Sequence, residues 1–125
     1  TDLSKVESIN ELISKIKSET QQVDILVNVA GIWHDDKEVF ADKDFEEFSQ
    51  EVILDTYNVG LTASTLLAHG FLPRMGSGGR IINISGTFRN GAKGWLPYYI
   101  SKKAIEDLTV GLAEELKDKE KRRFL

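Results

Sequence analysis

One run of seven residues, from Val23 to Val29, constrains the fold more than any other part of the sequence. It is almost continuously apolar and rich in β-branched side chains, and it stops at Ala30-Gly31. Such a run is typical of a strand that is buried on both faces of a parallel sheet. Because parallel strands need long crossover connections, which are usually helices, the run predicts an α/β fold.

Helical and strand patterns alternate along the rest of the chain. The expected elements are a helix over 4–21, the strand just described, a long helix over about 45–72, a strand over about 80–85 and a helix over about 97–118. Ser4 and Glu7 have the spacing of a capping box for the first helix. Pro73 and a glycine-rich turn are expected to end the long helix, and Pro97 to open the last one.

Composition excludes several functional classes. The chain has 125 residues, 41% of them hydrophobic and 29% charged, which suits one soluble domain or a large piece of one. Its net charge of -4 is spread over both signs without a basic stripe, so nucleic acid is not an expected partner. No apolar run reaches the roughly 20 residues of a membrane span, and no signal peptide is evident at the start.

The chain contains no cysteine. This excludes disulfides, thiolate metal sites and cysteine nucleophiles, and it fits a reducing compartment, so the cytoplasm is the expected location. His34 and Asp35 lie together in a region of mixed charge, but no ligand spacing links them to His69. We therefore expect a solvated loop there and no metal site.

Tyr98 and Lys102 open the last expected helix, thirteen residues after Ser85 at the end of the second strand. Helical residues four apart share a face, so the phenol and the ammonium are expected to converge above the carboxyl end of that strand. This arrangement suits proton transfer to a carbonyl oxygen. Tyr-x-x-x-Lys alone is a weak signal, because such a pair is often a surface pair, and Tyr99 and Lys103 repeat the spacing.

Several motifs together resemble the middle of the short-chain dehydrogenase/reductase family. The run 28–31, Asn-Val-Ala-Gly, is similar to the family's Asn-Asn-Ala-Gly after its fourth strand. Asn58 resembles the family's helix asparagine, and Tyr98, Ser101 and Lys102 match its Tyr-x-x-Ser-Lys. The resemblance implies a partial doubly wound Rossmann-type fold, with parallel strands and flanking helices. Residues 1–125 would form one partial domain without the N-terminal glycine-rich unit and the C-terminal strands.

The resemblance also implies a role for each of four residues. Tyr98 would act as general acid in reduction and as general base in oxidation. Lys102 would favour the phenolate and hold the nicotinamide ribose. Ser85 would bind the substrate oxygen, and Asn58 would position a water for proton relay. The implied cofactor is NAD or NADP, bound in the complete domain by Asn28, Ala30 and Gly31 together with Tyr98 and Lys102.

The residue that supplies the hydroxyl stays open. The family commonly has Asn-Ile-Ser-Ser with the second serine catalytic, whereas residues 83–86 read Asn-Ile-Ser-Gly. If strand register decides, Gly86 occupies the catalytic position, and Ser85 or Thr87 must supply the hydroxyl. The spacing to Tyr98 favours Ser85.

Two functions follow. The first is an oxidoreductase that transfers hydride between NAD(P)(H) and a small carbonyl or alcohol substrate, with the isolated chain inactive. The second is a truncated, inactive scaffold that serves as a binding or assembly module. The family also implies a homodimer or homotetramer through the two long helices. There Gly60, Ala63 and Ser64 would either allow close approach of a second copy or simply pack on the sheet.

Overall fold

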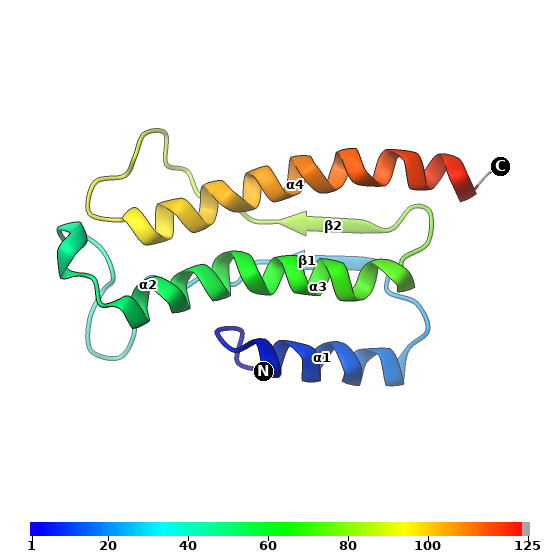
Figure 1. Cartoon of the computed structure of the whole chain (residues 1–125), viewed down its shortest axis with the longest axis horizontal. Coiled ribbons are helices and arrows are strands. Elements are labelled where there is room, and N and C mark those ends of the chain that lie inside the picture. Colours follow the sequence, from blue (N-terminus) through cyan, green and yellow to red (C-terminus); the bar gives the residue numbers. More distant parts are fainter. Residues whose placement is uncertain (124–125) are drawn as a thin grey trace.

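A computed structural model describes residues 1–123, with side chains to residue 117. Four α-helices and three short turns of other helix types lie over a two-stranded sheet (Figure 1). In chain order the elements are α1 (Val6–Glu19), β1 (Ile25–Asn28), η1 (Phe45–Glu47), α2 (Gln50–Tyr57), η2 (Asn58–Thr62), α3 (Ala63–Phe71), η3 (Leu72–Arg74), β2 (Arg80–Asn83) and α4 (Leu96–Arg123). The predicted order of helices and strands is confirmed.

The two strands pair in parallel, as predicted. The register runs from Ile25 opposite Arg80 to Asn28 opposite Asn83. Both strands therefore end at the same edge of the sheet, where the loops that lead to α2 and α4 begin.

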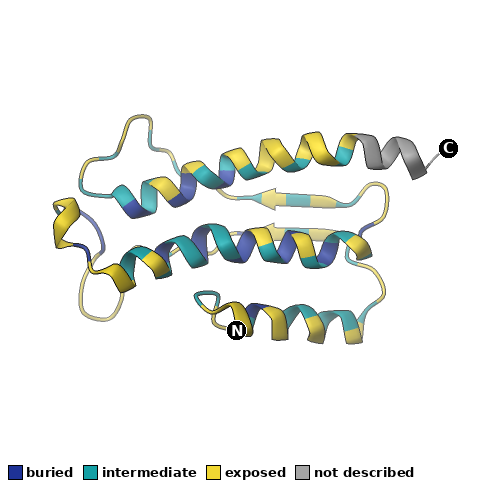
Figure 2. Cartoon of the chain, in the orientation of Figure 1, coloured by how far each residue is buried: buried dark blue, intermediate teal, exposed yellow. Residues whose placement is uncertain are grey.

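The expectation that β1 is buried on both faces is wrong for the described chain. Ile25, Val27 and Val29 are 61%, 50% and 60% exposed. Side chains alternate between the two faces of a strand, and the described helices all lie on one side of the sheet (Figure 2). The alternate residue Leu26 faces them and packs against their core.

The helices that cover β1 form the main apolar core. It joins α1 to α3 through four buried residues, Ile9, Ala63, Leu67 and Phe71. Gly70 lets the two helices approach closely, because an added Cβ would lie 2.8 Å from Cδ1 of Ile13.

The long helix expected over 45–72 is interrupted. It begins as α2 after Ser49, whose hydroxyl accepts the N–H of Val52 at 3.1 Å. It then widens into the π turn η2 before it continues as α3. The sequence gives no sign of this turn, since its apolar spacing continues across it.

The capping box predicted at Ser4 and Glu7 is not formed. The first helix begins at Val6, with Lys5 at the cap position. The hydroxyl of Ser4 instead donates to the Asp2 carboxylate at 2.6 Å, and the Ser4 N–H donates to the same oxygen. A local turn at Asp2 therefore competes successfully for the capping side chain.

The last helix, α4, begins one residue before Pro97 and extends beyond the predicted end at 118. Its first half packs against α2 and η2, and its second half runs along β2. No helix in the described part of the chain is long and apolar enough to cross a membrane.

Candidate functional site

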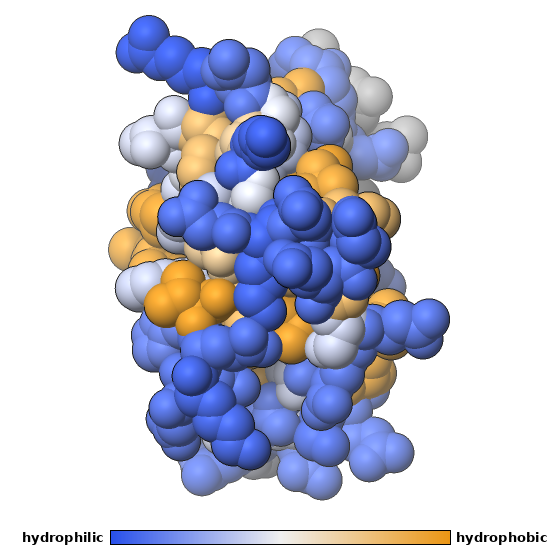
Figure 3. All heavy atoms as spheres, turned by 90° about the vertical axis from the view of Figure 1, so that its left-hand side faces the viewer, coloured by the Kyte–Doolittle hydropathy of each residue, from blue (hydrophilic) through white to orange (hydrophobic). Residues whose placement is uncertain are grey.

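The candidate site lies at the edge where both strands end and α4 begins. In an open α/β sheet, ligands bind outside the carboxyl ends of the strands. Viewed from this end, hydrophilic side chains cover much of the surface and leave apolar patches between them (Figure 3).

Lys102 is the most unusual group at this edge. Its side chain lies in the interior, since the residue is only 4% exposed, and its Nζ donates to the carbonyl oxygen of Ile84 at 3.2 Å. No salt bridge to Lys102 is formed by the residues whose side chains the structure describes. Burial disfavours the charged amine and so lowers the pKa of Lys102 from the ordinary lysine value.

Tyr98 lies beside this ammonium, one helical turn earlier in α4. Lys102 Nζ is 5.6 Å from the centre of the Tyr98 ring. Gly31, at the end of β1, completes the group. A Cβ added to it would lie 3.3 Å from Lys102 Nζ and 3.5 Å from Tyr98 Cε2. The structure thus brings three predicted site residues from two distant segments together.

Phe88 and Trp95 form an aromatic wall next to Tyr98. The ring centre of Phe88 is 5.8 Å from that of Tyr98 in a T-shaped contact, and 5.9 Å from that of Trp95. The ring centre of Trp95 is 6.1 Å from that of Tyr98, so Trp95 also borders the site. Phe88 gives no signal in the sequence because it lies in a loop without periodicity.

Asn28 is buried, and its amide is used within the fold. It donates to Oδ1 of Asn83 at 2.8 Å, and the Asn83 amide donates to the Thr109 hydroxyl at 2.9 Å. This chain of hydrogen bonds ties the ends of both strands to α4. Ala30, two residues further, is exposed beside Gly31.

The Ser85 hydroxyl is directed toward α4. It donates to Oε1 of Glu106 at 2.5 Å and lies 3.2 Å from the carbonyl oxygen of Lys102. Glu106 also accepts from Lys103 Nζ at 2.7 Å. These bonds, first that from Lys103 and then that from Ser85, lower the pKa of the Glu106 carboxyl. Sequence analysis missed Glu106, although it stands three residues after Lys103.

The Asn58 side chain forms hydrogen bonds with Ser4 and Thr62. Its amide donates to the carbonyl oxygen of Ser4 at 3.2 Å, and its Oδ1 accepts from the Thr62 hydroxyl at 3.2 Å. The residue of the same turn that meets α4 is Gly60, whose added Cβ would lie 2.8 Å from both Cβ and Oγ of Ser101.

The small residues of η2 and α3 are used inside the chain. Gly60 lies buried against α4, and Ala63 and Ser64 are 1% and 5% exposed. These residues pack inside the chain, and the contact of Gly60 is with Ser101 on α4 rather than with the sheet.

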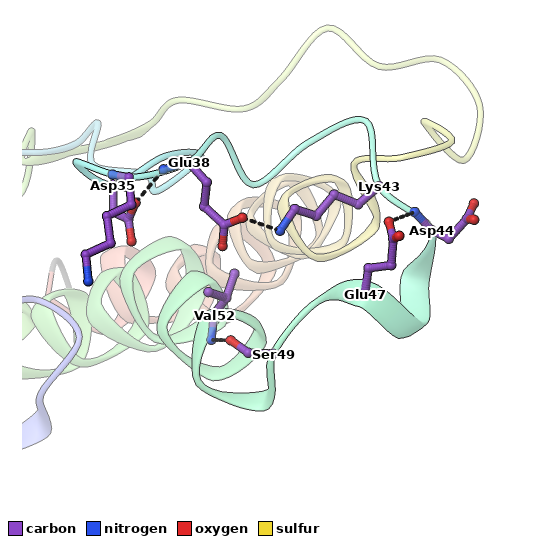
Figure 4. A network of polar contacts seen from close by, with 8 residues as sticks. Asp35, Glu38, Lys43, Asp44, Glu47, Ser49 and Val52 are labelled. Carbon is purple, nitrogen blue, oxygen red and sulfur yellow. Dashed lines mark hydrogen bonds and ion pairs between the residues drawn. The ribbon is translucent and has the colours of Figure 1, made fainter.

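The loop between β1 and α2 is organised by polar contacts of its own (Figure 4). The Asp35 carboxylate accepts the N–H groups of Lys37 and Glu38, and these bonds lower its pKa. Lys43 forms a 2.7 Å salt bridge with Glu38. His34 contacts the carbonyl oxygen of Asp35. In the part of the chain that the structure describes, no group of His, Cys, Asp and Glu side chains is arranged to hold a metal ion.

Comparisons with known proteins identify the family of the chain. Residues 1–122 match the family model described as short chain dehydrogenase. The chain is 36% identical over 117 residues to the 2-dehydro-3-deoxy-D-gluconate 5-dehydrogenase of Bacillus subtilis. The matched region covers 91% of this chain and 43% of that protein. The chain spans less than half the length of the curated relatives that it matches.

Solved structures show the same partial correspondence. A short chain dehydrogenase from Burkholderia cenocepacia in complex with NADP matches with a TM-score of 0.78 and 27% identity, over 93% of this chain and 45% of that one. A metagenomic short-chain oxidoreductase in complex with NADP matches with a TM-score of 0.80 and 27% identity, over 94% and 51%. These neighbours bear out the prediction of a partial Rossmann-type fold.

Proposed function

Because the chain belongs to the short chain dehydrogenase family, we propose that it carries the proton-transfer half of an NAD(P)-dependent oxidoreductase site. The reaction is hydride transfer between NAD(P)(H) and a small carbonyl or alcohol substrate. The observation that supports this most directly is a buried Lys102 beside the Tyr98 ring, with no salt bridge from the side chains that the structure describes.

In this proposal Tyr98 donates its proton to the carbonyl oxygen during reduction and takes it back during oxidation. The Lys102 ammonium favours the phenolate that remains after the proton has left. Its bond to the Ile84 carbonyl holds Nζ at the end of β2, where it stays next to the ring.

The residues at the end of β1 fit a cofactor that approaches the backbone closely. Gly31 has no side chain and faces Tyr98 and Lys102, and Ala30 beside it is small and exposed. We assign these residues, with Asn28 supporting them, to the nicotinamide side of a bound NAD or NADP. When bound, the cofactor supplies or accepts the hydride.

Ser85 remains our first choice for the hydroxyl that binds the substrate oxygen, with Thr87 as the alternative. The Ser85 hydroxyl bonds to Glu106 in the structure, so it must turn away from that carboxylate to reach a substrate. We also keep Asn58 as the residue that positions a water for proton relay, with its amide bonded to Ser4 in the structure.

The test is a comparison of two tyrosine variants within a polypeptide that contains the complete domain. Oxidation of NADH and NADPH is followed with a panel of small ketones and aldehydes. Tyr98→Phe is expected to lower kcat by about 10²–10⁴-fold, the usual contribution of a general acid. Tyr99→Phe is the matched control on the next position of the same helix and keeps its rate. Equal rates for both variants would overturn the proposal.

The second candidate is an inactive binding scaffold, and the exposed apolar face of the sheet favours it. It predicts that the 125-residue chain forms a defined complex with another polypeptide and that the polypeptide with the complete domain does not oxidise NADH or NADPH. We further propose a homodimer or homotetramer through the two long helical segments, α2 to α3 and α4, in the cytoplasm. Light scattering of the purified protein measures that assembly directly.

A further inference from the structure

Gly60 is the point at which the π turn η2 touches α4. The turn is closed by a hydrogen bond from the N–H of Ala63 to the carbonyl oxygen of Asn58, five residues apart. Such a turn holds one residue more than an α-helical turn, and these turns often occur at functional sites. Here it places a buried glycine directly against Ser101.

The contact leaves no space for a side chain. A Cβ on Gly60 would lie 2.8 Å from both Cβ and Oγ of Ser101, a distance at which something must shift. Ser101 is 2% exposed, and its hydroxyl donates to the carbonyl oxygen of Tyr98 at 2.7 Å. A Cβ atom is fixed to the backbone, so the obstruction is relieved only if α4 moves or the turn deforms.

Ser101 stands between the two residues of the proposed proton-transfer pair. Lys102 follows it directly, and Tyr98 lies one turn before it on the same helix. The distance between η2 and α4 at this contact therefore fixes how deeply the first turns of α4 sit over the ends of the strands.

We infer that Gly60 is a positioning residue for Tyr98 and Lys102: its missing side chain lets α4 seat closely enough to bury the Lys102 ammonium against Ile84. The structural contact stands on its own. Its importance for catalysis rests on the function proposed above.

Asn58 and Thr62 support this reading of the turn. Their side chains bond to each other, and the Asn58 amide also bonds to Ser4 before α1. The Asn58 end of the π turn is thereby tied to the segment before α1, and Gly60 lies against Ser101.

The chain offers a matched control for a substitution at Gly60. Gly70 lies on the continuation of the same helix, and a Cβ there would be equally close, 2.8 Å, to Ile13 Cδ1. That obstruction is the Ile13 side chain on α1, whose Cγ2 and Cγ1 atoms would also lie 2.9 and 3.2 Å away. Gly60→Ala and Gly70→Ala thus add the same atom at a similar distance, but only the first presses on α4.

The experiment measures the titration of Lys102 by NMR in the lysine-labelled 125-residue chain, with the signal assigned by Lys102→Met. Gly60→Ala is expected to move α4 outward and to admit water, which raises the pKa of Lys102 toward the ordinary lysine value. Gly70→Ala is expected to leave that titration unchanged. The double variant Gly60→Ala with Ser101→Gly removes the obstructing Cβ and Oγ and is expected to restore it.

The result is decisive whether or not the single variant folds. If Gly60→Ala folds with the wild-type Lys102 titration, or if Gly70→Ala shifts it equally, the inference is wrong. If Gly60→Ala does not fold, the double variant must both fold and show the wild-type titration, and failure of either also refutes the inference. In the complete domain, Gly60→Ala is expected to lower kcat by about 10²-fold, as misplaced reacting groups do.

This test is separate from that of the proposed function. An unaltered rate in Tyr98→Phe would refute the chemistry but leave the Lys102 titration as a measure of the contact. An unaltered titration in Gly60→Ala would refute the positioning role and leave the Tyr98 result untouched.

Discussion

The two halves of α4 differ sharply in how they are packed. In the first half Pro97, Ser101, Lys102 and Ile105 are buried against α2, η2 and the ends of the strands. In the second half Val110 is 64% exposed, and a Cβ added to Gly111 would meet open space. A cavity of about 460 Å³ separates this half from β2 and η3, with Ile81 and Leu112 among its lining residues.

This difference shows that the first half of α4 is well packed within the chain and that the second half is not. Tyr98 and Lys102 of the candidate site come from the half of α4 that packs against α2 and η2. The open half lies along the free edge of β2, and the solved neighbours have chains about twice as long as the part that matches. We therefore expect the site's local geometry to be set by contacts within this chain.

The two halves of α4 should respond very differently when a large apolar side chain is replaced by alanine. Ile105→Ala, at a residue 2% exposed, is expected to lower the free energy of unfolding by about 2–5 kcal/mol. Leu112→Ala, two turns later beside the cavity, should cost about 1 kcal/mol or less, because its side chain is only half-buried. Urea unfolding followed by circular dichroism measures both. Equal costs would show that the second half is packed as well as the first.

The buried charge in the first half predicts a pH dependence. The pKa of Lys102 is lowered by burial, so between that pKa and the ordinary value the unfolded chain binds more protons than the folded one. The free energy of unfolding therefore rises with pH across this interval. Lys102→Met lacks this contribution. The free energy of unfolding of wild type minus that of Lys102→Met, measured by urea unfolding, should be larger at pH 10 than at pH 7. A constant difference would contradict the assignment.

The smallest expected effect is at Gly111. Gly111→Ala meets no atom within 4 Å and replaces a glycine inside a helix, so it should raise the free energy of unfolding by about 0.5–1 kcal/mol. Thermal unfolding of the variant measures this gain. A loss at Gly111 would show that the second half of α4 is more constrained than its exposure indicates.

Much of the fold followed from local pattern. The apolar run of β1 and the helical spacing after Pro97 gave the right elements, because each is decided by residues close in sequence. Tyr98, Lys102 and Gly31 were also expected together, since parallel strands end at one edge of a sheet. The structure adds that Gly31 directly faces the other two.

What escaped prediction depends on packing between distant segments. The π turn around Gly60 lies where α4 packs against a helix whose apolar spacing is otherwise regular. The Ser85 hydroxyl turns to Glu106 because that carboxylate lies on the neighbouring helix. One face of β1 is exposed because the described helices cover only the other face of the sheet. The pattern of apolar residues in the strand does not show which helices are present to cover it.

The uncovered face of the sheet has a practical consequence for handling this chain in solution. Ile25, Val27, Val29, Ile82 and Ile84 are each more than 40% exposed, and the net charge that keeps molecules apart is only -4. Near the isoelectric point of about 5.2 this repulsion vanishes, and added salt screens it at any pH. The chain should therefore stay dispersed best in dilute, mildly alkaline buffer, and precipitate first on acidification.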